Sequence, residues 1–286
     1  MIAPTSAALI AEGAEILKNA GNEDADFDAR QLLLHLTGRS PAELLLQKDE
    51  PLPEPAARGY RDLIARRAAG EPLQYIIGRW QFYKSEFFVG PGVLIPRPET
   101  EELTDRCVRY LHDREGAAVY DLCAGSGCIG ISIALACPGT DVYLFELSDA
   151  ALGYLKKNIP AAVADRVHTI RLDIFAPCPP GLPAPDLIVS NPPYIPRGEL
   201  AGLQQEVQKE PAMALDGGAD GLDFYRRITA YWLELLNENG FAALECGEAQ
   251  AKEIAAMLPA GFAHEIGSDS FGAERFVFAH RKPTAG

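Results

Sequence analysis

The sequence predicts an α/β protein, with a mostly parallel β-sheet covered by helices on both faces and a small helical domain before it. Three observations lead to this prediction. The first 72 residues carry short helical patterns, and from about residue 96 buried strands alternate with helices. A stretch rich in aromatic and β-branched residues lies between them. With 286 residues, 48% of them hydrophobic, the chain is long enough for one large and one small domain.

Four short helices are expected in the first domain, residues 1–72, because apolar residues recur there at helical spacing. The third has the clearest start. Ser40-Pro41-Ala42-Glu43 is a capping-box pattern with proline at the first helical position. The expected helices begin near Ser6 (as the cap), Asp26, Pro41 and Pro53, and the first, second and fourth stop at Gly21, Gly38 and Gly70.

Residues 73–95 are expected to form a β-hairpin that links the two domains. From Gln74 to Leu94 the apolar residues are aromatic or β-branched, and glycines interrupt them. Pro96-Arg97-Pro98-Glu99-Thr100 then opens a helix that runs to about His112. The second domain, residues 96–286, begins with this helix.

The second domain alternates strands and helices of the size that builds a parallel sheet with helices on both faces. At its end, residues 263–266 and 275–279 are expected to form two strands around a tight turn at 267–272. This terminal hairpin implies one antiparallel strand at the end of the sheet. The other expected strands are 118–122, 141–146, 167–171, 186–190 and 241–245, and the expected helices are 128–136, 149–158, 224–236 and 248–258.

The composition argues against several classes of function. A net charge of −14 disfavours nucleic acid as a partner, because non-specific affinity for it comes mainly from neutralised phosphates. No apolar run is long enough to span a membrane, and the N-terminal residues resemble no targeting signal, so a cytoplasmic protein is expected. No metal site is expected, because the cysteines form no C-x-x-C pair; they are Cys107, Cys123, Cys128, Cys137, Cys178 and Cys246.

A glycine-rich turn between a strand and a helix indicates a cofactor site. Within Cys123-Ala124-Gly125-Ser126-Gly127-Cys128-Ile129-Gly130, three glycines match G-x-G-x-x-G, so a nicotinamide dinucleotide has to be considered. Two carboxylates favour S-adenosyl-L-methionine as the cofactor. Asp121, before the turn, would repel a pyrophosphate but suits a ligand with an ammonium and a sulfonium group. Glu146 ends the next strand, where it can accept hydrogen bonds from ribose hydroxyls.

The end of the third strand supplies the expected contacts to the adenine ring. Asp173 offers a hydrogen-bonding carboxylate, and the neighbouring Ile174 and Phe175 offer an apolar surface. Together they are expected to hold the adenine by a polar and an apolar contact.

The tetrapeptide Asn191-Pro192-Pro193-Tyr194 points to the chemistry. It follows a buried strand, and ligands of such sheets bind at the carboxyl ends of strands. An amide or base amine is a poor nucleophile, and two acceptors aimed at its N–H bonds would orient it. The Asn191 side-chain oxygen and the Pro192 carbonyl can supply them, held by the rigid prolines. Tyr194 is expected to stack on the planar group. A methyltransferase acting on a planar nitrogen is therefore expected.

At this point the chain resembles a known family, the protein-(glutamine-N(5)) methyltransferases that modify peptide chain release factors. The resemblance extends over nearly the whole chain and is far more specific than the tetrapeptide. Besides the glycine turn and Asn191–Tyr194 it includes Gly78-Arg79-Trp80-Gln81-Phe82-Tyr83, Leu94-Ile95-Pro96-Arg97-Pro98-Glu99-Thr100-Glu101, Glu210-Pro211 with Leu215-Asp216-Gly217-Gly218, and Leu244-Glu245-Cys246-Gly247.

The resemblance implies a seven-stranded, Rossmann-like class I methyltransferase sheet and an N-terminal domain that grips the release factor. It implies methylation of the glutamine in a Gly-Gly-Gln tripeptide. By motif position, Cys123 to Gly127, Glu146, Ile174 and Asn191 would contact the cofactor, and Asn191 to Tyr194 would hold the glutamine. Departures from the family pattern are modest: Cys123-Ala124 replaces Gly-Thr, Glu146 replaces the commoner Asp, and Ile174 stands where an aromatic residue can occur.

Two other substrates remain open at this level. A glutamine of a ribosomal protein would use the same catalytic motifs. An adenine amino group of DNA or RNA would also fit the tetrapeptide, but it would require base flipping and a basic groove, against the acidic composition. A non-enzymatic nucleotide-binding protein would leave Asn191–Tyr194 unexplained.

Overall fold

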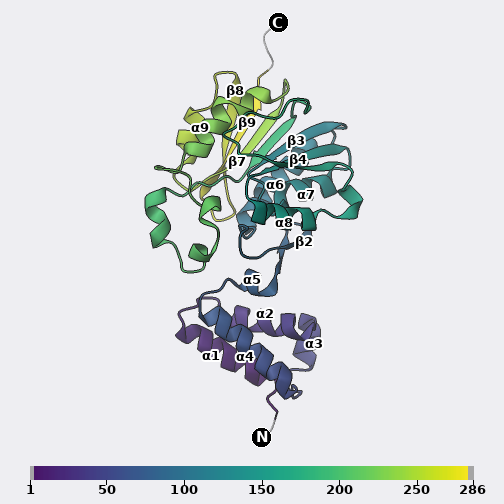
Figure 1. Ribbon diagram of the computed structural model, residues 1–286, viewed down its shortest axis with the longest axis vertical. Helices are drawn as coiled ribbons and strands as arrows, with labels where there is room; N and C mark the ends of the chain where they lie inside the picture. Colours follow the sequence, from purple (N-terminus) through teal and green to yellow (C-terminus); the bar gives the residue numbers. More distant parts are fainter. Residues whose placement is uncertain (1–2, 283–286) are drawn as a thin grey trace. The chain divides into compact units, whose positions relative to one another are not determined.

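The computed structural model of the protein describes residues 3–282. The chain divides into two compact units, Met1–Arg79 with Gln204–Lys209, and Trp80–Leu203 with Glu210–Gly286 (Figure 1). The outer ends of the two expected domains, residues 1–2 and 283–286, lie outside the described residues. The boundary between the units lies between Arg79 and Trp80, within the stretch expected to be the linking hairpin.

The first unit is helical, as expected, and its helices begin and end close to the predicted places. The capping box at Ser40 is present, with both reciprocal hydrogen bonds to Glu43. The first cap differs from the prediction: Thr5 rather than Ser6 caps the helix, because its hydroxyl accepts from the backbone of Ala8. The helices are α1 (Ser6–Asn19), α2 (Ala25–Thr37), α3 (Pro41–Leu46), α4 (Glu54–Ala68) and α5 (Leu73–Ile77).

A buried tyrosine and a buried arginine make polar contacts inside this unit. Tyr60 is fully buried and donates a hydrogen bond to the Ala29 carbonyl. Buried Arg67 donates to Asp28 at 2.6 Å and also pairs with Glu206. Removing one partner of a buried pair leaves the other charge uncompensated. Sequence reasoning did not anticipate that Gln204–Lys209, far along the chain, belongs to this unit.

The expected hairpin at 74–94 is only partly correct. Its first residues form α5, because Pro72 precedes a full helical turn and Gly78 ends it in the left-handed conformation. The hairpin itself is shorter, with β1 (Arg79–Phe82) and β2 (Ser85–Phe88). The following helix, α6 (Pro98–Leu111), begins at the second proline of the Pro96–Thr100 motif.

The second unit contains a seven-stranded sheet in the order β5-β4-β3-β6-β7-β9-β8. All strand pairs are parallel except those made by β9, which runs antiparallel to both β7 and β8. The antiparallel strand predicted at the end of the sheet therefore lies one position in from the edge. The strands are β3 (Ala117–Leu122), β4 (Thr140–Glu146), β5 (Val167–Arg171), β6 (Leu187–Ser190), β7 (Phe241–Glu245), β8 (Phe262–Ser268) and β9 (Glu274–Arg281).

Helices cover both faces of the sheet, as the alternation predicted. Along β3, Val119 packs in the hydrophobic core under α6, α7 and α8, whereas Tyr120 packs in the opposite core under α9 and α10. The predicted helix 224–236 is divided, because a 3₁₀ turn at Trp232–Leu235 follows α9 and buries Trp232 against the sheet. The helices are α7 (Cys128–Ala136), α8 (Asp149–Asn158), α9 (Asp223–Ala230) and α10 (Ala251–Ala256).

Candidate active site

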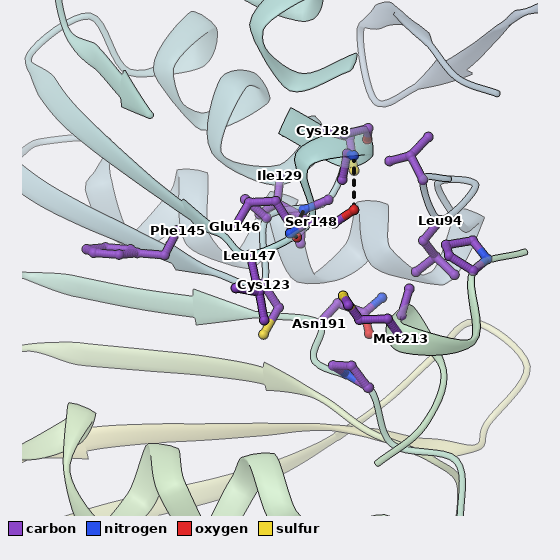
Figure 2. A pocket seen from close by; sticks show the side chains of 18 of the residues that line it. Leu94, Cys123, Cys128, Ile129, Phe145, Glu146, Leu147, Ser148, Asn191 and Met213 are labelled. Atoms are coloured by element: carbon purple, nitrogen blue, oxygen red, sulfur yellow. Dashed lines mark hydrogen bonds between the residues drawn. The ribbon is translucent and has the colours of Figure 1, made fainter. Parts of the chain in front are cut away.

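One large cavity opens at the carboxyl ends of β3, β4 and β6, within the second unit (Figure 2). This is where ligands bind in sheets of this kind, beside the point at which strand order reverses from β3 to β4 and β6. Most of the predicted site residues line it. They are Cys123, Ala124, Gly125, Ser126, Glu146, Asp173, Ile174, Asn191 and Pro193.

The glycine turn forms one wall of the cavity. Gly125 has a φ of 56°, and a Cβ placed on it would meet nothing within 4 Å, so the backbone here lies open to a ligand. Gly130 has the opposite environment: its Cβ would lie 2.3 Å from the Leu144 side chain. The first glycine therefore leaves room for a ligand, and the third lets α7 approach the sheet.

Gly127, predicted to allow close approach of a ligand, does not line the cavity. Its φ is 79°, and a Cβ there would lie 2.8 Å from Ile131 and 3.2 Å from Leu155. This glycine is required by its backbone conformation at the N-cap of α7 and by the packing behind the turn. The expectation of a contact to the ligand is not supported here.

Glu146 links the glycine turn to the end of β4. One carboxylate oxygen accepts from the Gly125 backbone N–H at 2.8 Å, and the other accepts from Ser148 N–H at 2.7 Å. The side chain is 9% exposed and lines the cavity. A carboxylate held in this way by two backbone donors presents its remaining lone pairs in a fixed direction, which suits a pair of hydroxyl donors.

The end of β5 supplies an apolar floor. Ile174 is buried, and its carbonyl accepts from Trp232 and Arg227, which fixes its place on the wall. Asp173 lines the same region, and its carboxylate accepts from the Phe175 backbone N–H at 3.0 Å. This pairing of an apolar surface with an adjacent carboxylate matches the predicted contact to a planar, amino-bearing ring.

Asn191 is the first residue after β6, and two side chains hold its amide group. Its amide nitrogen donates to Glu245 Oε1 at 2.9 Å and to Thr100 Oγ1 at 3.2 Å. With both amide hydrogens engaged inside the protein, Oδ1 is the side-chain atom left to accept from a ligand. Glu245 and Thr100 were not predicted as site residues. The only sequence signal was their place in motifs of the family resemblance.

Glu245 is the last residue of β7 and does not line the cavity. It is 2% exposed, and its second oxygen, Oε2, has no hydrogen-bond partner among the described residues. Burial raises the pKa of its carboxyl to about 7, while the Thr100 hydroxyl lowers it. The carboxyl is thus balanced between its protonated and ionised forms near neutral pH.

Two members of the tetrapeptide lie outside the cavity lining. Pro193 lines it, whereas Pro192 and Tyr194 do not. The Tyr194 carbonyl accepts from Gln250 Nε2 at 2.9 Å, which ties the end of the tetrapeptide to the loop before α10. Burial raises the pKa of the Tyr194 hydroxyl to about 12, so it stays protonated. In this arrangement the predicted stacking surface of Tyr194 is not part of the cavity wall.

Asp121 differs most from its prediction. It is fully buried beneath the glycine turn, and its Oδ2 accepts from the Gly130 backbone N–H at 2.9 Å. It does not reach the cavity, because it points from β3 toward the first turn of α7. Gly127 at the N-cap has no side chain, so Asp121 supplies the acceptor that a capping side chain would give. Its role is structural support of the turn.

The cavity is mildly acidic. Of its charged side chains, Arg97 pairs with buried Glu210, while Glu146 and Asp173 have no cationic partner in the cavity lining. A ligand with positive charge therefore suits it better than a pyrophosphate. The cavity lining also contains residues that the sequence did not single out as site residues: Leu94, Ile95, Pro96, Arg97, Pro211 and Met213.

Within residues 3–282, no helix is long and apolar enough to cross a membrane. The same residues contain no group of three His, Cys, Asp or Glu placed to hold a metal ion. All six cysteines are free thiols.

Comparison with known proteins adds sequence and structural relatives. Residues 8–78 match the family described as PrmC N-terminal domain, and residues 100–218 match the Methyltransferase small domain. The release factor glutamine methyltransferase of Geobacter sulfurreducens is 40% identical over 243 residues, covering 85% of this chain and 84% of the relative. That of Rhodospirillum rubrum is 37% identical over 277 residues, covering 96% and 84%.

A solved structure supports the fold alone. The catalytic domain of hMettl16, in complex with MAT2A 3′UTR hairpin 6, aligns with a TM-score of 0.53 at 16% identity. The alignment covers 78% of this chain and 83% of that one. With the seven strands of the sheet and the match to the Methyltransferase small domain, the predicted seven-stranded methyltransferase sheet is confirmed.

Proposed function

The chain belongs to the release factor glutamine methyltransferase family, and on that premise we propose that it methylates the glutamine side-chain amide in the Gly-Gly-Gln tripeptide of peptide chain release factors. One observation carries the proposal: a single cavity combines the open backbone of Gly125, the fixed carboxylate of Glu146 and the oriented amide of Asn191. As a modifier of translation factors, the protein would act in the cytoplasm.

The methyl donor is S-adenosyl-L-methionine, which supplies a methyl group activated by its positive sulfonium centre. The residues of the cavity fit this group. Gly125 leaves open space at the turn, and the unpaired lining charges are carboxylates. Glu146 would hold the ribose hydroxyls, and Asp173 with Ile174 would hold the adenine.

Asn191 would act on the substrate rather than on a proton. Its Oδ1 would accept one N–H of the glutamine amide, which helps to fix the nitrogen lone pair toward the methyl group. The Pro192 carbonyl, predicted to accept the other N–H, does not line the cavity in this structure. A general base is not required before attack, because alkylation itself makes the N–H acidic. Pro193 lines the cavity close to Asn191 and would help to exclude water.

The helical unit would dock the release factor. A glutamine on a loop tip offers little surface of its own, so contacts made far from it would provide binding energy and position it. Helix α3 carries two adjacent leucines at the surface, Leu45 and Leu46, which are 66% and 85% exposed. Exposed leucines of this kind are suited to a protein partner.

The test is transfer of labelled methyl from S-adenosyl-L-methionine to an intact release factor, a Gly-Gly-Gln peptide, ribosomal proteins and DNA, followed by peptide mapping. Label on the tripeptide glutamine of the intact factor, with a much lower kcat/KM for the peptide, is the expected result. Label on a ribosomal protein alone, or on DNA, would replace the proposed substrate. Equal kcat/KM for peptide and intact factor would refute the docking role.

Asn191→Ala is expected to lower kcat by about a hundredfold, the scale for loss of one preorganised polar group. The affinity for S-adenosyl-L-methionine, measured by calorimetry, should change much less, because Gly125 and Glu146 remain. A variant with near-normal turnover would show that Asn191 has only a structural role.

A further inference from the structure

We infer that Glu245 is a positioning residue, which fixes the side-chain amide of Asn191 so that its oxygen, and not its nitrogen, faces the substrate. This inference rests on the proposed function, because it assumes that Asn191 receives the glutamine N–H. It adds a residue outside the cavity to the machinery that the reaction needs.

The geometry follows from strand order. Ser190 on β6 pairs with Leu244 on β7, so the next residues, Asn191 and Glu245, lie side by side at the carboxyl ends of the two strands. The 2.9 Å hydrogen bond from Asn191 Nδ2 to Glu245 Oε1 connects residues that are 54 positions apart in the chain. Glu245 touches no cavity surface, so it can act only through its neighbours.

An asparagine amide has two ends of similar shape and opposite polarity. If it turned over, Asn191 would present N–H groups to the substrate amide, and donor would then face donor. Thr100 alone does not select between the two ends, because a hydroxyl can both donate and accept; it accepts from Asn191 while its side chain hydrogen-bonds Glu245. An ionised carboxylate only accepts, so Glu245 admits the Nδ2 end of Asn191 and excludes the Oδ1 end. Glu245 is therefore the group that selects the orientation.

Burial makes this selection strong. Glu245 is 2% exposed, and water cannot replace it as an acceptor. Its backbone is held as well, because Tyr225 donates its hydroxyl hydrogen to the Glu245 carbonyl at 2.6 Å.

Three variants and one control test the inference: Asn191→Ala, Glu245→Leu, the double variant of the two, and Thr104→Val. Thr104 is a matched control for the polar residues of the site. It is buried on α6 one turn after Thr100, and its hydroxyl donates only to the Thr100 carbonyl. The readouts are kcat with intact release factor at pH 8.5 and calorimetric affinity for S-adenosyl-L-methionine.

Glu245→Leu is expected to lower kcat by at least about tenfold, a loss typical of a disturbed preorganised group, with cofactor affinity within about twofold. The double variant should be no slower than Asn191→Ala, because residues acting as one unit are not additive. Thr104→Val should keep normal kcat. If Glu245→Leu does not fold, Glu245→Gln replaces it. The side-chain amide of glutamine can turn either its oxygen or its nitrogen toward Asn191, so a several-fold loss of kcat is expected.

The outcomes separate the two proposals. If Asn191→Ala lowers kcat but Glu245→Leu does not, only the inference is overturned. The same holds for a normal kcat of Glu245→Gln, where the leucine variant does not fold. A double variant slower than Asn191→Ala by the full Glu245 factor also overturns it, because Glu245 would then act independently. An equal loss of cofactor affinity in Glu245→Leu would assign Glu245 a structural role. Near-normal Asn191→Ala refutes the acceptor role in the proposed function, and the inference with it.

Discussion

Asp121 and Glu245 are two buried carboxylates with nearly the same local setting and different tasks. Each lies near the carboxyl end of a central strand, points to the sheet face covered by α6 and α7, and leaves one oxygen without a partner among the described residues. Asp121 accepts from the Gly130 backbone at the start of α7, whereas Glu245 accepts from the side chain of Asn191. The two carboxylates therefore differ in their partner and not in their burial, and the proposed positioning role of Glu245 rests on its contact with Asn191.

The pKa of both carboxyls is raised, and the main cause is the same. Burial raises the pKa of each to about 7. For Asp121 the Gly130 N–H opposes this shift and Glu146 adds to it. For Glu245, Glu99 adds to it, while Thr100, Arg275 and Arg97 oppose it. A raised pKa alone thus does not distinguish the carboxyl that contacts Asn191 from the one that supports α7.

The largest expected effect is on how the free energy of unfolding depends on pH. An acid whose pKa is raised on folding stabilises the folded state below its unfolded pKa, and this contribution is lost as pH rises through the folded pKa. For Asp121 the window runs from about 4 to about 7. Asp121→Asn should therefore gain stability relative to the wild type by up to about 1.4 kcal/mol per pH unit in this window, and then level off.

Urea unfolding followed by tryptophan fluorescence at several pH values measures this difference. The methyl-transfer kcat of Asp121→Asn should stay within about threefold of the wild type, because Asp121 does not reach the cavity. A constant stability difference from pH 5 to 8 would contradict the buried, proton-binding state of Asp121.

A smaller effect should follow from disturbing Asp121 without removing it. In Gly130→Ala the new methyl would lie 2.3 Å from Leu144 and 3.0 Å from the Asp121 carboxylate, so α7 must shift from the sheet. Overpacking of this kind costs about 1–3 kcal/mol. The matched control is Gly153→Ala on α8, where a Cβ meets nothing within 4 Å and higher helix propensity should stabilise slightly. Equal unfolding midpoints for the two variants would contradict the close approach of α7.

The smallest expected effect is a pH profile specific to Glu245. With a pKa of about 7, Glu245 ionises as the pH rises from 6 to 8, and only the ionised form excludes the inverted Asn191 amide. The kcat of the wild type should therefore rise several-fold over this range, with a midpoint near 7. Glu245→Gln should lack this rise, while Asp121→Asn should keep it. A rise retained in Glu245→Gln would assign it to another group.

Much of the fold could be predicted from the chain because hydrophobic periodicity and capping are local. The helices at 128–136 and 149–158 and the strands at 167–171 and 241–245 have the predicted bounds. Errors occurred where a local pattern was ambiguous. Aromatic and β-branched residues favoured a strand at 73–77, yet Pro72 and Gly78 enclose one helical turn there. Gln204–Lys209 joins the helical unit through partners, such as Arg67, that are distant in sequence.

The candidate site divides in the same way. Residues at strand ends and in the glycine turn could be named from sequence, because parallel strands bring their carboxyl ends to one edge. Glu146 and Asn191 are examples, and both line the cavity. The sequence did not reveal which way a buried strand-end side chain points. Asp121 therefore received a ligand role that belongs to the support of α7, and Glu245 received none.

By itself, the sequence determined the strand and helix alternation, the open glycine turn and the placement of Asn191 at the cavity, since these depend on neighbours along the chain. Only the tertiary structure decided that β7 lies beside β6, which places Glu245 against Asn191. The physical reason is that strand order depends on packing across the whole sheet. A hydrogen bond between residues 54 positions apart leaves no trace in local spacing.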